Sequence, residues 1–311
     1  MSSSEHIDPK NSLNLYGLRD KLDFLIKLHN SKKLPRVLML TGKKGIGKFT
    51  LINHFLNYIY DNENYDRINN SINRKTQFYK QYLNNMFPNI IHLKGDNFRN
   101  IRINDIRDLK SKILKTSMLE KKRFIVLDDI ELFNTNSLNA LLKIIEEPSS
   151  ENYFILINNK TKSLIDTIHS RSLEINISMT NEMRIKVIES LIKKNDLDIF
   201  IDFKSLSLTP GDFLSFNEIC KENEINIDDD YLRNLKLLLS IYKKDKNISI
   251  INMILFLTDY YFYNRKEKKQ DNLDKVMNDK SYVINNINKF IELNLNQTSL
   301  INSINNKLFN G

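Results

Sequence analysis

VLMLTGKKGIGKFT, residues 37–50, is a short apolar run followed by a turn that contains three glycines. The run Val37–Leu40 predicts a buried strand, and FTLINHFLNYIY, residues 49–60, predicts a helix. Glycines in such a turn let successive backbone N–H groups converge on phosphate oxygens, and a lysine at its end neutralises them. The order of strand, glycine-rich turn and helix therefore predicts a phosphate-binding loop in an α/β domain.

The residue after the lysine departs from a working phosphate loop. That position normally carries a small hydroxyl that holds Mg²⁺, and here it is Phe49. Thr50 lies one helical step away, about 100° around the helix axis. The loop and helix residues expected to contact a nucleotide are Gly42, Gly45, Gly47, Lys48 and Thr50.

Continuous apolar runs along the chain predict further strands that are covered on both faces. Helical apolar spacing separates them, as in SLNALLKIIEE, residues 137–147, and in a helix that Asn104 is expected to cap. Strands and helices that alternate to about residue 178 predict a doubly wound parallel sheet, whose ligands lie at the carboxyl ends of the strands. The predicted strands after the first are residues 89–93, 124–127, 153–157 and 173–177.

Two acids end the central strand, and an asparagine follows the next one. Asp128 suits a carboxylate that positions Mg²⁺ through water, and its neighbour is usually a Glu that polarises the attacking water. Asp129 stands there instead, with a side chain about 1.5 Å shorter. A misplacement of roughly 1 Å can cost about a hundredfold in rate, so hydrolysis is expected to suffer. Asn159 is expected to contact phosphate or water.

After residue 178 the pattern is only helical, with a break at Thr209-Pro210-Gly211. We therefore predict three domains: a P-loop α/β domain over 1–178, a small helical lid over 179–228, and a helical oligomerisation domain over 229–311. Long Ile/Leu stripes in the last domain suit packing against related subunits, although a self-contained bundle is the alternative.

Composition restricts the class of protein. A single cysteine excludes an internal disulfide and a Cys-based zinc site, and the five histidines never fall at ligand spacing, so no metal is expected. The sequence shows neither a signal peptide nor a membrane span, and we expect a cytoplasmic protein without a membrane partner. The formal net charge of +9 suits a nucleic-acid neighbour or a lysine-rich solvated surface.

Several of these segments together resemble the AAA+ subunits of DNA clamp loaders. The stretch from residue 128 to residue 172 looks like that family, and the chain most resembles the delta-prime subunits of the bacterial DNA polymerase III clamp loader. The resemblance covers about residues 13–215. The segments that carry it are 42–51, Asp128-Asp129, 139–143, Glu146-Glu147-Pro148 and Ser170-Arg171-Ser172.

The resemblance implies a subunit of a ring-shaped pentamer that opens a sliding clamp and sets it around primed DNA, with gamma/tau-type and delta-type subunits as partners. Ser170-Arg171 corresponds to the Ser-Arg-Cys motif of the family, which makes Arg171 an arginine finger inserted into the ATP site of the next subunit. The zinc module of the family is missing, and apolar packing from Tyr79, Tyr82 and Phe87 is expected in its place.

A third departure falls in the lid motif, where related ATP-using subunits carry an arginine after Pro-Gly and this chain carries Asp212. That carboxylate is expected either to face the triphosphate, which it would repel, or to point into solvent. Phe49, Asp129 and Asp212 thus alter three parts of one ATP site, while Arg171 is kept.

We therefore predict a clamp-loader subunit that does not hydrolyse ATP, requires no cofactor, and serves a neighbouring site through Arg171. Whether ATP and Mg²⁺ bind at all stays open. The alternatives are an active gamma-type clamp-loader ATPase and a free-standing basic AAA+ protein that binds nucleic acid directly.

Overall fold

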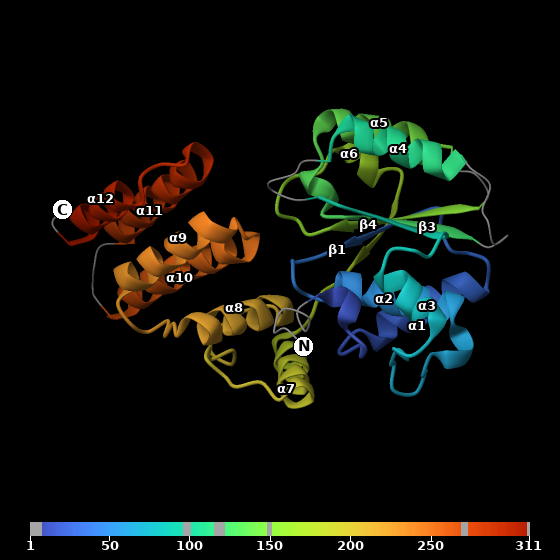
Figure 1. Ribbon diagram of the computed structural model, residues 1–311, viewed down its shortest axis with the longest axis horizontal. Helices are drawn as coiled ribbons and strands as arrows, with labels where there is room; N and C mark the ends of the chain where they lie inside the picture. The colour runs from blue at the N-terminus through green and yellow to red at the C-terminus, as the bar shows by residue number, and fades with distance from the viewer. Residues whose placement is uncertain (1–7, 96–100, 115–121, 148–150, 269–272, 310–311) are drawn as a thin grey trace. The chain divides into compact units, whose positions relative to one another are not determined.

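The computed structural model describes residues 8–95, 101–114, 122–147, 151–268 and 273–309. They divide into two compact units, one formed by Met1–Asp198 with Phe203–Leu214 and the other by Ile199–Asp202 with Ser215–Gly311. Figure 1 shows an α/β first unit and a helical second unit.

The first unit is built on a five-stranded parallel sheet in the order β2-β3-β4-β1-β5. The apolar runs predicted to be strands all pair in this sheet. Its central strands are wholly buried because helices cover both faces. The strands are β1 (Val37–Thr41), β2 (Ile90–Lys94), β3 (Arg123–Asp128), β4 (Asn152–Asn158) and β5 (Leu173–Asn176).

Alternate residues of each strand point to opposite faces and enter two separate cores. On one face Leu38 and Leu40 of β1 pack among residues of the helices α1, α2 and α3, and on the other face Met39 packs among residues of α4, α5 and α6. Figure 1 shows the same two layers of helices. The helices are α1 (Arg19–Asn30), α2 (Lys48–Tyr60), α3 (Gln77–Leu83), α4 (Ile103–Leu114), α5 (Thr135–Ile145) and α6 (Asp166–His169), with the 3-10 turns η2 (Pro9–Asn11), η3 (Asn62–Asn64) and η4 (Ile130–Leu132).

The predicted cap of α4 is wrong. Asn104 lies inside the first turn of the helix, which begins at Ile103. The carboxylate of Asp105 instead accepts a hydrogen bond from the backbone N–H of Arg102 at 2.7 Å. An acid in the first turn that reaches back to the N–H of the residue before the helix makes one half of a capping box.

The aromatic residues expected to pack after the helix α2 do so. Tyr79 and Tyr82 are buried, and Phe87 packs against the same core. Phe78 makes an edge contact with Phe87, with ring centroids 4.8 Å apart, and Tyr60 lies 4.7 Å from Phe87 on another side. Edge-to-face aromatic pairs of this kind hold a segment that has little regular structure.

Past β5 the chain is helical, as predicted. The expected break at Thr209-Pro210-Gly211 is in fact the start of α8, in which Pro210 and Gly211 are the first residues. Proline suits that place because its missing N–H would have no partner in the first turn. The helices are α7 (Asn181–Asn195), α8 (Pro210–Asn223), α9 (Tyr231–Asp245), α10 (Ile248–Lys268), α11 (Leu273–Leu293) and α12 (Gln297–Phe309). The three-domain division stays a prediction.

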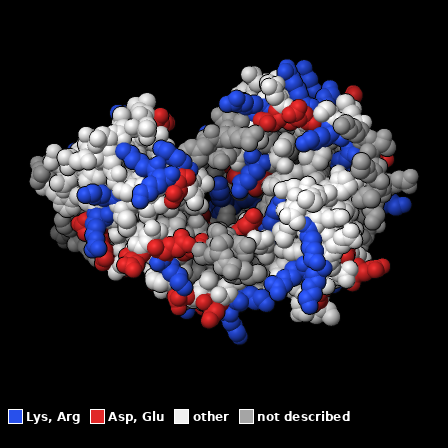
Figure 2. Space-filling model, viewed as in Figure 1, with Lys and Arg blue, Asp and Glu red and all other residues white. Residues whose placement is uncertain are grey.

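Acidic side chains lie among the basic ones on the face of each unit that Figure 2 shows. In the second unit, Lys243 lies over the ring of Phe290 and Lys246 lies over the ring of Tyr242. Within the described ranges, no helix is long and apolar enough to cross a membrane, and no group of His, Cys, Asp or Glu could hold a metal ion.

Candidate functional site

The phosphate loop joins β1 to α2 and requires its glycines. Gly42, Gly45 and Gly47 all have positive φ, at 150°, 77° and 95°. A Cβ on Gly42 would lie 2.2 Å from the carbonyl oxygen of Ile177, so the loop also needs glycine for close packing. The predicted strand, turn and helix are therefore in place, with Gly47 directly before the first residue of α2.

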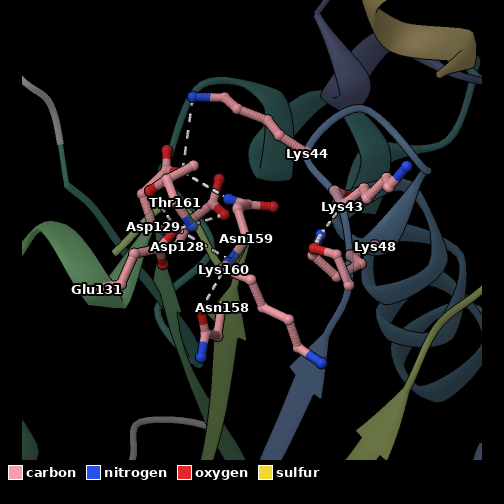
Figure 3. A network of polar contacts seen from close by, with 11 residues as sticks. Lys43, Lys44, Lys48, Asp128, Asp129, Glu131, Asn158, Asn159, Lys160 and Thr161 are labelled. Carbon is pink, nitrogen blue, oxygen red and sulfur yellow. Dashed lines mark hydrogen bonds and ion pairs between the residues drawn. The ribbon is translucent and has the colours of Figure 1, made fainter. Parts of the chain in front are cut away.

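Lys48 binds the loop itself. Its side chain is only 3% exposed, and Nζ donates hydrogen bonds to the carbonyl oxygens of Gly42 at 2.6 Å and Lys43 at 2.8 Å. Burial lowers the pKa of Lys48 to about 8, although the charges of nearby acids, Asp128 above all, raise it. Figure 3 shows the ammonium group within the loop. The ammonium group that was expected to bind phosphate therefore bonds to two carbonyl oxygens of its own loop.

Phe49 fills space beside the sheet instead of supplying a hydroxyl. Its ring lies against His92 of β2, with centroids 4.9 Å apart. Burial lowers the pKa of His92 to about 4, so the imidazole is neutral and packs as a ring. Thr50 is partly exposed, and its hydroxyl makes no hydrogen bond within the described part of the chain.

The two acids at the end of β3 have different environments. Asp128 is 8% exposed, and burial, followed by the charge of Asp129, raises its pKa to about 6. Asp129 has φ of 52° and therefore turns away from the strand direction. Its Oδ1 accepts a hydrogen bond from Asn159 Nδ2 at 2.5 Å and lies 3.6 Å from Lys44 Nζ. Figure 3 shows Lys44 reaching from the phosphate loop to this acid.

Glu131 is a third acid of the site that the sequence pattern missed. It is 5% exposed, and its Oε1 accepts hydrogen bonds from the backbone N–H of Asn159 at 3.1 Å and from Thr161 Oγ1 at 2.9 Å. Its Oε2 is buried and has no hydrogen-bond partner among the described residues. Glu131 thus holds the loop after β4 against η4 (Figure 3).

The start of α8 lies directly on the phosphate loop. Gly211 N donates to Gly45 O at 2.8 Å, and a Cβ on Gly211 would lie 2.7 Å from Gly45 Cα. The carboxylate of Asp212 accepts a hydrogen bond from Thr209 Oγ1 at 2.7 Å, and its orientation toward a triphosphate stays a prediction. Burial raises the pKa of Asp212, and that hydrogen bond opposes the rise.

A cavity of about 370 Å³ adjoins the phosphate loop, within the size range of small-molecule sites. Lys43 and Lys160 contribute charge to its lining, and Ile177 and Met179 contribute apolar surface. The guanidinium of Arg184 also lines it but is held by Asn181 Oδ1 at 2.7 Å and by backbone carbonyls. The sequence pattern did not single out these lining residues, because they come from segments far apart in the chain.

Arg171 lies apart from the phosphate loop, just after α6. It is exposed, with 36% of its side chain accessible, and pairs with Glu146, which is 45% exposed. Its Nε and Nη2 reach Glu146 Oε1 at 2.9 Å and 2.7 Å, and its Nη1 donates to Thr167 O and Ser170 Oγ. Within the described residues, none of its hydrogen bonds goes to the phosphate loop. Ser170 Oγ donates to Thr167 O at 3.2 Å.

The buried carboxyl of Asp128 predicts a pH effect on stability. A folded pKa near 6, against about 4 in the unfolded chain, means that the free energy of unfolding falls as pH rises through this window, by about 3 kcal/mol. Asp128→Asn cannot ionise, so at pH 7.5 the variant is expected to be more stable than the parent by about 1–3 kcal/mol, and the two converge near pH 4.

Urea unfolding at pH 4.5 and pH 7.5 measures this effect. Asp108→Asn, at an exposed position of α4, is the matched control and should leave the pH dependence unchanged. A gain for Asp128→Asn that is equal at both pH values would contradict the assignment.

The chain matches the family model described as "DNA polymerase III, delta subunit" over residues 18–181, more than half of its length. Two similar relatives are DNA polymerase III delta' subunits. That of Pseudomonas aeruginosa is 36% identical over 24% of this chain and 23% of its own length. That of Buchnera aphidicola subsp. Baizongia pistaciae is 24% identical over 78% of this chain and 72% of its own length.

A solved structure, a gamma subunit-related DNA polymerase III protein from Thermotoga maritima, covers 90% of this chain and 96% of its own, with 14% identity and a TM-score of 0.47. The family match and the delta' relatives confirm the resemblance seen in the sequence, and the parallel sheet with its phosphate loop agrees with an AAA+ domain. The chain belongs to the DNA polymerase III delta subunit family and, within it, to the delta-prime clamp-loader subunits.

Proposed function

We propose that this chain acts in a clamp loader without hydrolysing ATP itself and donates Arg171 to the ATP site of a neighbouring subunit. The observation that carries the proposal is the contrast between the two sites. The phosphate site has lost its hydroxyl at Phe49 and its lysines are paired beside the sheet, whereas Arg171 lies exposed at the surface, where its pair with Glu146 is open to solvent.

Three contacts within the chain hold the phosphate site together. Lys48 donates to carbonyls of its own loop, Lys44 pairs with Asp129, and Gly211 of the lid bonds to Gly45. A nucleotide would have to exchange these contacts for its own, so binding is expected to be weak. The fold can then serve as a rigid wedge between active subunits.

The exposure of Arg171 supports its use by a partner. A guanidinium placed on the charge that develops in phosphoryl transfer is worth on the order of 10³ to 10⁵ in rate. Surface ion pairs contribute only about 0–1 kcal/mol, so the pair with Glu146 can be exchanged for a phosphate at little cost.

The partners that this function requires are gamma/tau-type and delta-type subunits, a sliding clamp and primed DNA within the assembled complex, in the cytoplasm. The helical domain over 229–311 would provide the assembly surface, and the lid over 179–228 would close the phosphate site. Large exposed apolar side chains in the second unit support such a surface; they are Leu237, Tyr263, Leu273, Met277, Leu293, Leu295 and Phe309.

An ATP hydrolysis assay on the isolated chain tests the first half of the proposal. The unmodified chain is expected to show no turnover above a protein-free blank, because Phe49 and Asp129 leave Mg²⁺ and water unpositioned. Phe49→Ser combined with Asp129→Glu is expected to restore measurable nucleotide binding.

Lys48→Met is the control, because turnover that survives it comes from a contaminant. Robust hydrolysis by the unmodified chain that Lys48→Met abolishes would contradict the proposal and favour an active gamma-type ATPase. Assembly is tested separately, by co-purification with a gamma-type subunit.

A further inference from the structure

Glu146 and Arg171 form a contact between two elements that the proposed function does not explain. Glu146 is the C-cap residue directly after α5, and Arg171 follows α6. Nε donates a hydrogen bond to Glu146 Oε1, and Nη1 donates to Thr167 O and Ser170 Oγ. Nη2 lies 2.7 Å from the same Glu146 Oε1 as an ion pair. The arginine must therefore leave a carboxylate before its Nε edge can bind a phosphate.

The position of Glu146 is unfavourable for an acid in the absence of a nearby cation. The last carbonyls of a helix carry partial negative charge, and an anion there is normally destabilising. The guanidinium of Arg171 offsets this charge at 2.7 Å. The acid at this end of α5 thus depends on the arginine, and the two form one unit.

Resting on the function proposed above, we propose that Glu146 competes with the neighbouring nucleotide for Arg171 and so makes the arginine selective for a triphosphate over a diphosphate. A terminal phosphate of ATP carries more charge than one carboxylate and offers several acceptor oxygens to the planar guanidinium. ADP lacks this terminal group, so with ADP next door the arginine stays on Glu146.

The strength of the Glu146–Arg171 ion pair suits discrimination between ATP and ADP. A ligand shifts an equilibrium only by its differential affinity for the two states. An exposed ion pair of modest strength is weak enough for ATP to draw Arg171 away from Glu146. The interaction of Arg171 with ADP is weaker, and the ion pair opposes it. Because Glu146 remains beside the released arginine, its charge also repels any phosphate that reaches only part of the way.

The test uses the full chain bound to a gamma-type ATPase subunit. Equilibrium titration measures the affinity between the two proteins when the ATPase subunit holds a slowly hydrolysed ATP analogue and when it holds ADP. The parent chain is expected to bind more tightly in the ATP-analogue state. Glu146→Gln is expected to tighten binding in the ADP state by about twofold to fivefold, the change that a surface ion pair is worth, and so to reduce the ratio of the two affinities.

Glu147→Gln is the matched control. Glu147 is the next residue, is exposed, and makes no ion pair with any described residue, so the same loss of charge there should leave the ratio unchanged. A purely structural role for Glu146 would weaken binding in both nucleotide states together and would leave the ratio unaltered. A circular dichroism melt checks that each variant is folded.

Arg171→Ala separates the inference from the function on which it rests. If this variant keeps the parent ratio, the arginine does not sense the neighbouring nucleotide and the proposed function fails. A different outcome is that Arg171→Ala makes the two affinities equal while Glu146→Gln and Glu147→Gln both keep the parent ratio. In that case the role of Arg171 as an arginine finger stands and the competition by Glu146 is refuted. A Glu146→Gln variant that binds the ATP-analogue state less tightly also refutes it, because the acid then positions the arginine.

Discussion

Arg171→Ala is expected to slow ATP hydrolysis at the neighbouring site of the assembled clamp loader by about a thousandfold or more. The guanidinium meets the charge that develops on the transferred phosphoryl group, and alanine leaves that charge to water. Arg171→Lys keeps the positive charge but loses the planar set of donors, so it is expected to recover only a small part of the rate. The measurement is DNA-stimulated ATP hydrolysis by the assembled complex in a single turnover, in which the site that this subunit serves becomes the slow phase.

Arg107→Ala is the control for this prediction. Arg107 is exposed on α4 and donates to Asn104, one turn earlier in the same helix. Both variants should fold and assemble like the parent, because each loses only a surface contact. Equal hydrolysis rates in the Arg171→Ala and Arg107→Ala complexes would contradict the role of Arg171 in trans.

The sheet could be predicted from the sequence because its signals are local. A central strand covered on both faces must be apolar along its whole length, and Phe124–Leu127 and Tyr153–Ile157 meet this condition. The glycine turn after β1 was equally plain, since positive φ at Gly45 and Gly47 is costly for other residues. Helix starts were less certain, as Asn104 and the segment Thr209-Pro210-Gly211 demonstrate, because several polar residues near a start can satisfy its N–H groups.

The hydrogen-bond and ion-pair partners of the site residues could not be predicted from the sequence. They depend on the direction in which each side chain points, and a single backbone dihedral angle can change that direction. The left-handed φ of Asp129 turns the chain so that Glu131 points toward the loop after β4, about thirty residues along the chain. A periodic pattern carries no information on such a turn. The pairing of Asp129 with Lys44 likewise requires two loops from different strands to meet at the edge of the sheet.

The second unit contains a buried ion pair that the sequence did not reveal. Asp279 of α11 is 1% exposed, and its Oδ2 lies 3.0 Å from Arg265 Nη1 of α10, whose side chain is 10% exposed. Its Oδ1 lies 3.5 Å from Lys307 Nζ of α12, an ion pair without hydrogen-bond geometry. One carboxylate thus connects three helices.

Asp279→Asn is expected to lower the free energy of unfolding by about 3 to 5 kcal/mol, because it leaves the buried charge of Arg265 without its carboxylate. Urea unfolding followed by far-UV circular dichroism measures the loss. Asp259→Asn is the matched control. Its carboxylate is 60% exposed and pairs with Lys280 at 2.8 Å, so the same substitution should cost less than about 1 kcal/mol.

A third variant distinguishes the uncompensated charge from a loss of packing. Arg265→Met with Asp279→Leu replaces both charges by apolar side chains, and it is expected to regain most of the stability that Asp279→Asn loses, because apolar pairs often replace buried ion pairs without loss. Such recovery would mean that the charged pair itself is not needed for stability and that the cost of Asp279→Asn comes from the buried charge left behind. A cost for Asp279→Asn no larger than that for Asp259→Asn would show instead that water reaches Arg265 and replaces the missing carboxylate.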